Sequence, residues 1–184
     1  MMKQLKYEII STPSQVESMR LIYNDNLDML STKPIPRREY QGQQDWWHEN
    51  KHALKAFLYE RLDQPGKFMA FLVIRDRGGF FTPILAIDKS AWGKGFGREI
   101  IHDYLELAGG PLAGSQLKSN RAICYLNSQF GWQVIGSKQE EAGEVELLYH
   151  PGINPKVLDS GTIHRIADYL NLSDSEVACK TECR

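Results

Sequence analysis

Residues 91–98 have the types and spacing in this chain that point most directly to chemistry. They read Ala-Trp-Gly-Lys-Gly-Phe-Gly-Arg, with glycine at 93, 95 and 97. Glycines let the backbone turn sharply and leave N–H groups unobstructed, and a helix that follows adds its positive dipole end. The run therefore predicts a binding site for a phosphate-bearing ligand.

The spacing of these glycines excludes the two commonest phosphate loops. A Walker-type loop needs glycine where Asp88 stands, and Ser or Thr where Gly95 stands. A dinucleotide loop needs its third glycine at the position of Arg98. A glycine-rich turn that merely joins two elements remains the alternative to a binding loop.

The segments on either side of the run favour a binding loop. Residues 80–87 are nearly all apolar, with aromatic and β-branched members, which is typical of a central strand covered on both faces. Apolar residues then recur at helical spacing over 96–108, and we expect Glu99 and Asp103 on the polar side of this helix. Gly109 ends it. The glycines thus lie between a strand and a helix.

Two motifs resemble those of the GNAT superfamily of N-acyltransferases. The family's pyrophosphate loop reads Gln/Arg-x-x-Gly-x-Gly/Ala; here Gly95 and Gly97 take the small positions and Trp92 replaces Gln or Arg. The Trp-Gly-Lys-Gly form is similar to the branch that acetylates ribosomal-protein N-termini and small-molecule amines. Residues 120–132 resemble the family's Asn-x-Ala segment, which ends in Gly-Phe, with Trp132 in the Phe position.

The resemblance implies a fold and an acyl donor. The fold would be α+β (mixed α/β), a mostly antiparallel central sheet of about 6–7 strands flanked by helices over residues 1–150. The donor would be acetyl-CoA, with no metal. Its carbonyl and pantetheine amides would pair with the fourth strand at 85–87, where Pro83 supports a break in the ladder or is simply tolerated. The residues implied in donor binding are Leu85, Ala86, Ile87, Trp92, Gly93, Lys94, Gly95, Phe96, Gly97, Arg98, Asn120 and Asn127.

The proton donor departs from the family pattern. Many relatives place a tyrosine seven residues after the asparagine, where this chain has Asn127, which is not a practical acid. Tyr125, Ser128 or a water held by Asn127 is then the candidate proton source, and the alternative is that these are ordinary helix residues. Cys124, within an apolar-rich helix, is more typical of packing than of acyl transfer.

The acceptor side is predicted from aromatic and titratable residues. Tyr40, Trp46 and Trp47 could form a substrate wall or could anchor the core. Glu146 and Tyr149 lie on a predicted final hairpin, which also carries Glu144 and His150 as candidate titratable groups. A solvated strand face is the alternative. The basic residues 33–38 favour an acidic or phosphorylated substrate, unless they are a solvated loop.

Local patterns predict the order of the elements. Residues 12–15 read Thr-Pro-Ser-Gln, a capping box with proline at the first helical position. We expect strands at 6–10, 54–61, 67–75, 80–87, 112–117, 132–137 and 144–149, and further helices at 43–50 and from 120.

The tail, residues 151–184, is expected to form a helical extension packed on the domain or on a partner. The small, turn and β-branched residues Ala167, Asn171 and Val177 have helix-turn-helix spacing. The second helix would carry Asp174, Glu176 and Glu182, which nucleic-acid phosphates would repel. Nucleic-acid binding is therefore disfavoured.

Composition indicates one ordinary globular domain. The chain has 184 residues, 42% hydrophobic content and a formal net charge of -1. We expect no membrane span and no signal segment. Three cysteines, Cys124, Cys179 and Cys183, favour a reducing, cytoplasmic location over a disulfide framework.

Two functional classes follow. The first is an enzyme that transfers acetyl from acetyl-CoA to a primary amine of a small molecule or peptide, by direct attack in a ternary complex. The second is a non-catalytic CoA-binding or interaction module that uses the C-terminal helices, which the missing tyrosine favours. The oligomeric state stays open, with a homodimer as one option.

Overall fold

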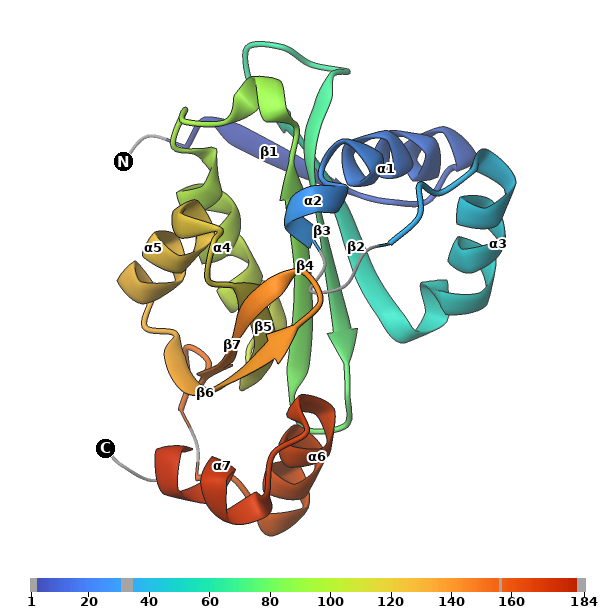
Figure 1. Ribbon diagram of the computed structural model, residues 1–184. Coiled ribbons are helices and arrows are strands. Elements are labelled where there is room, and N and C mark those ends of the chain that lie inside the picture. The colour runs from blue at the N-terminus through green and yellow to red at the C-terminus, as the bar shows by residue number, and fades with distance from the viewer. Residues whose placement is uncertain (1–2, 31–34, 156, 182–184) are drawn as a thin grey trace.

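A computed structural model describes residues 3–30, 35–155 and 157–181 (Figure 1). Its described strands form one sheet in the order β1-β2-β3-β4-β5-β7-β6, with β4 parallel to β5 and the other neighbours antiparallel. The strands are β1 (Leu5–Ile9), β2 (Leu54–Arg61), β3 (Phe68–Asp76), β4 (Phe81–Ile87), β5 (Leu112–Leu117), β6 (Gln133–Glu140) and β7 (Gly143–His150). The parallel pair thus joins two antiparallel parts of the sheet.

Helices cover both faces of this sheet (Figure 1). They are α1 (Pro13–Asp25), α2 (Leu27–Leu30), α3 (Tyr40–Asn50), α4 (Phe96–Ala108), α5 (Arg121–Gln129), α6 (Ser160–Leu170) and α7 (Asp174–Thr181). Short 3-10 turns span Lys51–Ala53 and Lys89–Ala91. α4 and α5 pack on one face, whereas α1 and α3 cover the other face beside α6. No described helix is long and apolar enough to cross a bilayer.

Strand side chains alternate between the two faces, and both faces are apolar. In β2, Phe57 and Tyr59 pack with α4, whereas Ala56 and Leu58 pack with α1 and α3. Period-two alternation puts successive side chains on opposite faces, so a sheet covered on both sides needs nearly continuous apolar strands. This explains the apolar runs that mark the central strands in the sequence.

Two helix starts show how far local signals reach. The predicted capping box at α1 is present, because Thr12 accepts from the Gln15 backbone N–H and the Gln15 side chain accepts from the Thr12 N–H. α3 begins at Tyr40 rather than at residue 43, and its N-cap Glu39 makes no side-chain cap bond. Without a capping side chain, no local signal marks where α3 begins.

The predicted polar side of α4 is wrong at two positions. Glu99 and Asp103 are buried, at 8% and 7% exposure. The Glu99 carboxylate accepts from the backbone N–H groups of Gln4 and Leu5, and Asp103 pairs with Lys3. These acids tie the N-terminal segment and β1 to α4, and helical periodicity cannot predict such partners.

The two C-terminal helices pack on the sheet. Ile166, Ala167 and Leu170 of α6, with Val177 of α7, share a buried cluster with residues of β5, β6 and β7. Asn171 ends α6 in a left-handed conformation with φ of 58°. The residues with helix-turn-helix spacing therefore serve packing and helix termination. Glu182 and Cys183 lie outside the described residues, and the division into 1–150 and 151–184 stays a prediction.

Candidate functional site

The parallel strands β4 and β5 separate soon after they meet. They pair at one position, Phe81 with Leu112, and the Phe81 N–H donates to the Pro111 carbonyl at 2.8 Å. The next donor on this edge of β4 falls two residues later. It is Pro83, which has no N–H, although the pairing of Pro83 with Ile74 on β3 is intact. The predicted break in the ladder is therefore present on the β5 side.

Beyond Pro83, one edge of β4 pairs with no strand among the described residues. No described residue of β5 pairs with Leu85 or Ile87, whose backbone groups lie on the same edge as those of Phe81 because orientation alternates along a strand. The Ile87 carbonyl accepts from the Trp92 indole N–H at 2.8 Å. Trp92 thus fastens the loop to the end of β4.

The glycine loop follows the separated end of β4. Gly93 and Gly95 have φ of 75° and 84°, and Gly95 is the N-cap of α4. Gly97 is needed for a different reason, since a Cβ there would lie 2.8 Å from Leu126 Cδ1 and 3.7 Å from Ile87 Cδ1. The start of α4, the end of β4 and the middle of α5 therefore converge at Gly97.

The start of α4 is electropositive. The first N–H groups of an α-helix lack the usual partner four residues earlier, and the dipole adds positive charge. Here the Arg98 N–H donates to the Gly95 carbonyl at 3.1 Å. Arg98 is exposed, and the Lys94 ammonium donates to the Ser90 carbonyl at 2.8 Å. Glu99 is the acidic residue of the first turn, and its carboxylate accepts a hydrogen bond from the Leu5 N–H of β1. Phe96 is buried and anchors the helix start in the core.

Asn120 is the N-cap of α5. Its side-chain oxygen accepts from the Ile123 N–H at 3.4 Å, so this residue has a local role in starting the helix. Its predicted contact with the pantetheine arm stays a prediction.

A buried polar chain connects α5, β5 and β7. Asn127 Nδ2 donates to Gln116 Oε1 at 2.8 Å, and Gln116 Nε2 donates to Glu146 Oε2 at 2.7 Å. Asn127 and Gln116 are 7% and 8% exposed. Asn127 Oδ1 is buried and has no hydrogen-bond partner among the described residues. Glu146 therefore lies on the α5 side of the sheet.

Sequence reasoning missed Gln116. The available signal was strand alternation. Gln116 is two positions from Gly114 and four from Leu112, so it shares their face of β5, which packs toward α4 and α5. A polar side chain on a covered strand face needs a partner, but the sequence does not say which one.

The other candidate proton donors lie nearer the surface. Tyr125 is 56% exposed, and the Ser128 hydroxyl donates to the Tyr125 carbonyl at 2.8 Å. Burial, together with the nearby Glu146 carboxylate, raises the pKa of the Cys124 thiol. A raised pKa disfavours the thiolate, which is the nucleophilic form.

The residues predicted to bind the acceptor differ in their exposure to solvent. Tyr40 is 49% exposed, whereas Trp47 and Tyr149 are core residues at 8% and 3% exposure. Trp46 is half-buried, with the Arg38 guanidinium 5.1 Å from its ring centroid. Burial leaves Trp47 and Tyr149 little surface for a substrate, so we omit both from the proposed site.

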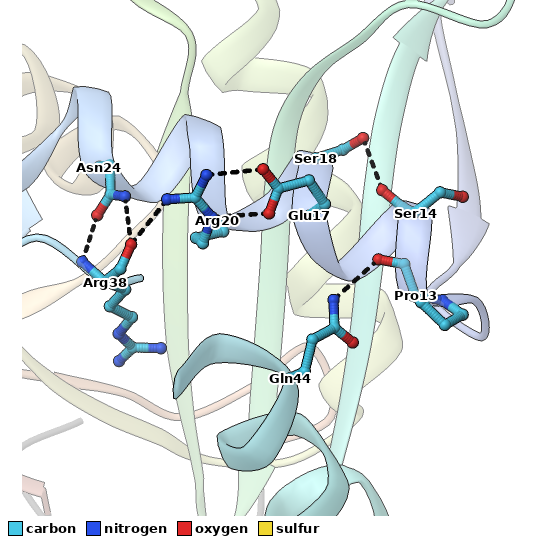
Figure 2. Close-up of polar contacts among 8 residues, drawn as sticks. All are labelled: Pro13, Ser14, Glu17, Ser18, Arg20, Asn24, Arg38 and Gln44. Carbon is cyan, nitrogen blue, oxygen red and sulfur yellow. Dashed lines mark hydrogen bonds and ion pairs between the residues drawn. The ribbon is translucent and has the colours of Figure 1, made fainter. Parts of the chain in front are cut away.

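Arg38 is held firmly between α1 and α3. Asn24 bonds both its backbone N–H and its carbonyl at 2.8 Å, and Arg20 also donates to that carbonyl (Figure 2). Its guanidinium points away from the Arg20–Glu17 pair in Figure 2, stacks 4.1 Å from the Tyr23 centroid and donates to Gln43. Of the basic residues 33–38, Lys33 and Pro34 lie outside the described residues.

His150 is part of the packing rather than an open base. Nδ1 accepts from the Gly152 N–H at 2.9 Å, so Nε2 carries the proton toward the Phe130 carbonyl, also at 2.9 Å. Elsewhere, His102, Asp103 and Glu106 on α4 bring ligand atoms within 4.8 Å, a grouping that the sequence analysis did not identify. Lys3 pairs with Oδ1 of Asp103 at 3.4 Å, and His102 and Glu106 are exposed, so we assign no function to this group.

Comparisons with known proteins identify the fold. No family model matches the chain, and no curated protein matches its sequence. A structure of spermidine N-acetyltransferase from Vibrio cholerae, in complex with CoA and spermine, is similar with a TM-score of 0.71 and 15% identity, over 81% of this chain and 96% of that one.

Two further solved structures agree. A putative phosphinothricin N-acetyltransferase has a TM-score of 0.68 at 15% identity, over 80% of this chain and 98% of that one. A GCN5-related N-acetyltransferase from Kribbella flavida has a TM-score of 0.68 at 14% identity, with the same coverage. The predicted GNAT fold, a mixed sheet flanked by helices, is therefore confirmed.

Proposed function

We propose that this chain is an N-acetyltransferase that moves an acetyl group from acetyl-CoA to a primary amine of a small molecule or peptide, by direct attack in a ternary complex. One observation carries this: β4 and β5 separate after Phe81, and the glycine loop and the start of α4 stand at the open end of β4. The likeness to acetyltransferase structures, one of which contains CoA and spermine, supports the same donor and an amine acceptor.

The donor would bind mainly to backbone groups. Its pyrophosphate fits the N-terminus of α4, where Gly93, Gly95 and Gly97 leave the N–H groups open and Lys94 and Arg98 add positive charge. Its pantetheine arm fits beside β4 as an added strand would. The backbone N–H of Leu85 or Ile87 would then polarise the thioester carbonyl.

The acceptor amine would attack this carbonyl directly. The nitrogen lone pair forms the C–N bond as the C–S bond breaks, the thiolate leaves with the bonding electrons, and the amine loses a proton to solvent. A water held near Asn127 supplies the proton to the thiolate, because Asn127 itself is not an acid. The raised pKa of Cys124 favours direct attack over an acyl-cysteine intermediate.

The acceptor would approach from the side of α1 and α3, where Tyr40, Trp46 and Arg38 are at least partly exposed. Arg38 pairs with no carboxylate among the described residues, which favours an acceptor that carries an acidic or phosphate group. The homodimer and the cytoplasmic location stay predictions.

A thiol-release assay with acetyl-CoA tests this function. The panel should hold polyamines, amino sugars, phosphorylated amino sugars, aminoglycosides and peptide N-termini. We expect CoA to raise the melting temperature and at least one amine to release thiol. Stabilisation by CoA without thiol release would favour the non-catalytic module, and no stabilisation by CoA would contradict both functions.

A further inference from the structure

The polar chain from half-buried Glu146 through buried Gln116 to buried Asn127 has a fixed direction. A carboxylate offers acceptors and no donor, so the side-chain atom of Gln116 that meets Glu146 must be its NH₂ group. Gln116 then turns its oxygen toward α5, and that oxygen needs a donor. Asn127 supplies its own NH₂ group, which leaves Oδ1 at the far end.

The far end of this chain is an unused acceptor. Asn127 Oδ1 is buried without a hydrogen-bond partner among the described residues, and burying such an atom unpaired is unfavourable. An amide that could rotate freely would be able to offer NH₂ instead. Here the Glu146 carboxylate, acting through Gln116, prevents that rotation.

This acceptor lies close to the proposed donor site. Leu126, the neighbour of Asn127, lies against the position of Gly97 at the start of α4, where the Ile87 side chain also approaches. Gln116 belongs to the part of β5 that has already separated from β4. Asn127 therefore follows directly the residue of α5 that meets the start of α4, and its side chain bonds to the part of β5 that no longer pairs with β4.

We propose that Glu146, acting through Gln116, positions the Asn127 amide so that Oδ1 accepts a hydrogen bond from an N–H group of the bound reactants. This rests on the proposed function. Oδ1 would repel an oxyanion, so its partner is either an amide N–H of the pantetheine arm or an N–H of the attacking amine, whose positive charge grows as the C–N bond forms. Glu146 is then a positioning residue and does not contact the substrate.

The direction of the chain can be reversed by two substitutions. Asn127→Asp places an acceptor against Gln116 Oε1, so Gln116 can satisfy one neighbour but not both. Glu146→Gln added to Asn127→Asp resolves the conflict, because Gln116 can then rotate, donate to the new carboxylate on α5 and accept from the new amide on β7. In this double variant the second carboxylate oxygen of residue 127 is still an acceptor, as Oδ1 is in the parent.

The experiment is a double-mutant cycle with N127D, E146Q and both together. Glu141→Gln is the matched control, since Glu141 is exposed in the turn between β6 and β7 and has been assigned no role in the site. We expect N127D to lower kcat/KM about tenfold, E146Q to lower it less, and the double variant to recover most of the loss. The control should stay within about twofold of the parent.

Two measurements separate the two N–H partners. If the pantetheine arm supplies the N–H, N127D weakens CoA binding in calorimetry and leaves the amine KM unchanged. If the amine supplies it, CoA binding is unchanged and the amine KM or kcat changes. Either result supports the proposal, provided that the double variant recovers.

A different pattern would overturn it. If N127D and E146Q lower activity additively while CoA still stabilises both variants, the chain does not position the amide. The same cycle on the free energy of unfolding, without ligand, shows whether the three residues are coupled at all. A parent protein that neither binds CoA nor releases thiol would instead contradict the proposed function, and the unfolding cycle would still report the coupling.

Discussion

The two strand-to-helix junctions at the centre of the sheet offer different chemical groups to a ligand. At the junction of β4 and α4, the groups that would meet a ligand are backbone N–H groups, and the side chains matter mostly by being absent, as at Gly95 and Gly97. At the junction of β5 and α5, the groups are side chains, Gln116 and Asn127, and they depend on Glu146 from another strand. The first site is local in sequence and the second is not.

This difference has a physical origin. A phosphate is satisfied by any set of N–H groups with the right spacing, and a glycine-rich turn before a helix provides them without outside help. An amide side chain can present either a donor or an acceptor, so its role is settled by whatever it is bonded to. Substitutions should therefore act through backbone shape at the first junction and through bonding partners at the second.

The largest effect is expected where α4 is tied to β1. Glu99→Ala removes the carboxylate that accepts from the Gln4 and Leu5 N–H groups, leaving both donors without it in a mostly buried place. We expect the free energy of unfolding to fall by about 3 kcal/mol, measured by urea denaturation. Glu106→Ala, exposed on the same helix, should change it by less than about 0.5 kcal/mol. Equal losses in both variants would contradict this account.

Next is the backbone conformation of the glycine loop. Gly95→Val forces a β-branched residue into a φ of 84°, which should cost about 1–2 kcal/mol of stability and disturb the N–H groups at the start of α4. CoA should then no longer raise the melting temperature. Gly42→Ala, in α3 with open space around it, is the matched control and should stabilise slightly. CoA binding that survives Gly95→Val would show that the site is not made of backbone groups.

A smaller effect is expected at Trp92, whose side chain fastens the glycine loop to the end of β4. Trp92→Phe keeps an aromatic ring but loses the N–H that donates to the Ile87 carbonyl. We expect a loss of about 1 kcal/mol in CoA affinity by calorimetry, with the melting temperature of the free protein almost unchanged. A change confined to stability would mean that Trp92 only supports the fold.

The smallest effect belongs to the tail, which should be independent of both junctions. Hydrogen bonding to Asp174 raises the pKa of His164 above its usual value of 6.5, and Asp168 adds to the shift. Protonated His164 is thus favoured in the folded state, so its stabilisation is full below about pH 6.5 and disappears as pH rises through the higher folded pKa. His164→Gln should flatten the pH dependence of unfolding above about pH 6.5 and leave CoA binding unchanged.

Sequence patterns anticipated features that depend on neighbouring residues. The strand before the glycines, the helix after them, the capping box at Thr12 and the break at Pro83 each follow from a few adjacent residues, and the structure contains them all. The role of Glu99 could not be predicted this way, because its partners lie 94 and 95 residues away along the chain. Gln116 and Glu146 belong to the same class, since 30 residues separate them.

Burial also changed the acceptor site that the sequence suggested. Trp46 and Trp47 are adjacent and chemically alike, yet Trp47 enters the core while Trp46 remains half-buried beside Arg38. Glu146 and Tyr149 also differ in their surroundings. They are three positions apart on β7, and side chains at an odd offset in a strand lie on opposite faces of the sheet. Which face of an element is covered depends on packing that a single sequence does not reveal.

Pro83 also sets a length. Residues 83 to 87 of β4 do not pair with β5, and at about 3.3 Å per residue this leaves about 13 Å of one strand edge unpaired with β5. An extended ligand that pairs with this edge from the loop end could reach only as far as Pro83, because β4 and β5 pair with each other beyond it. Under the proposed function, the position of this one proline would therefore limit how far the reactive end of an extended cofactor reaches into the sheet.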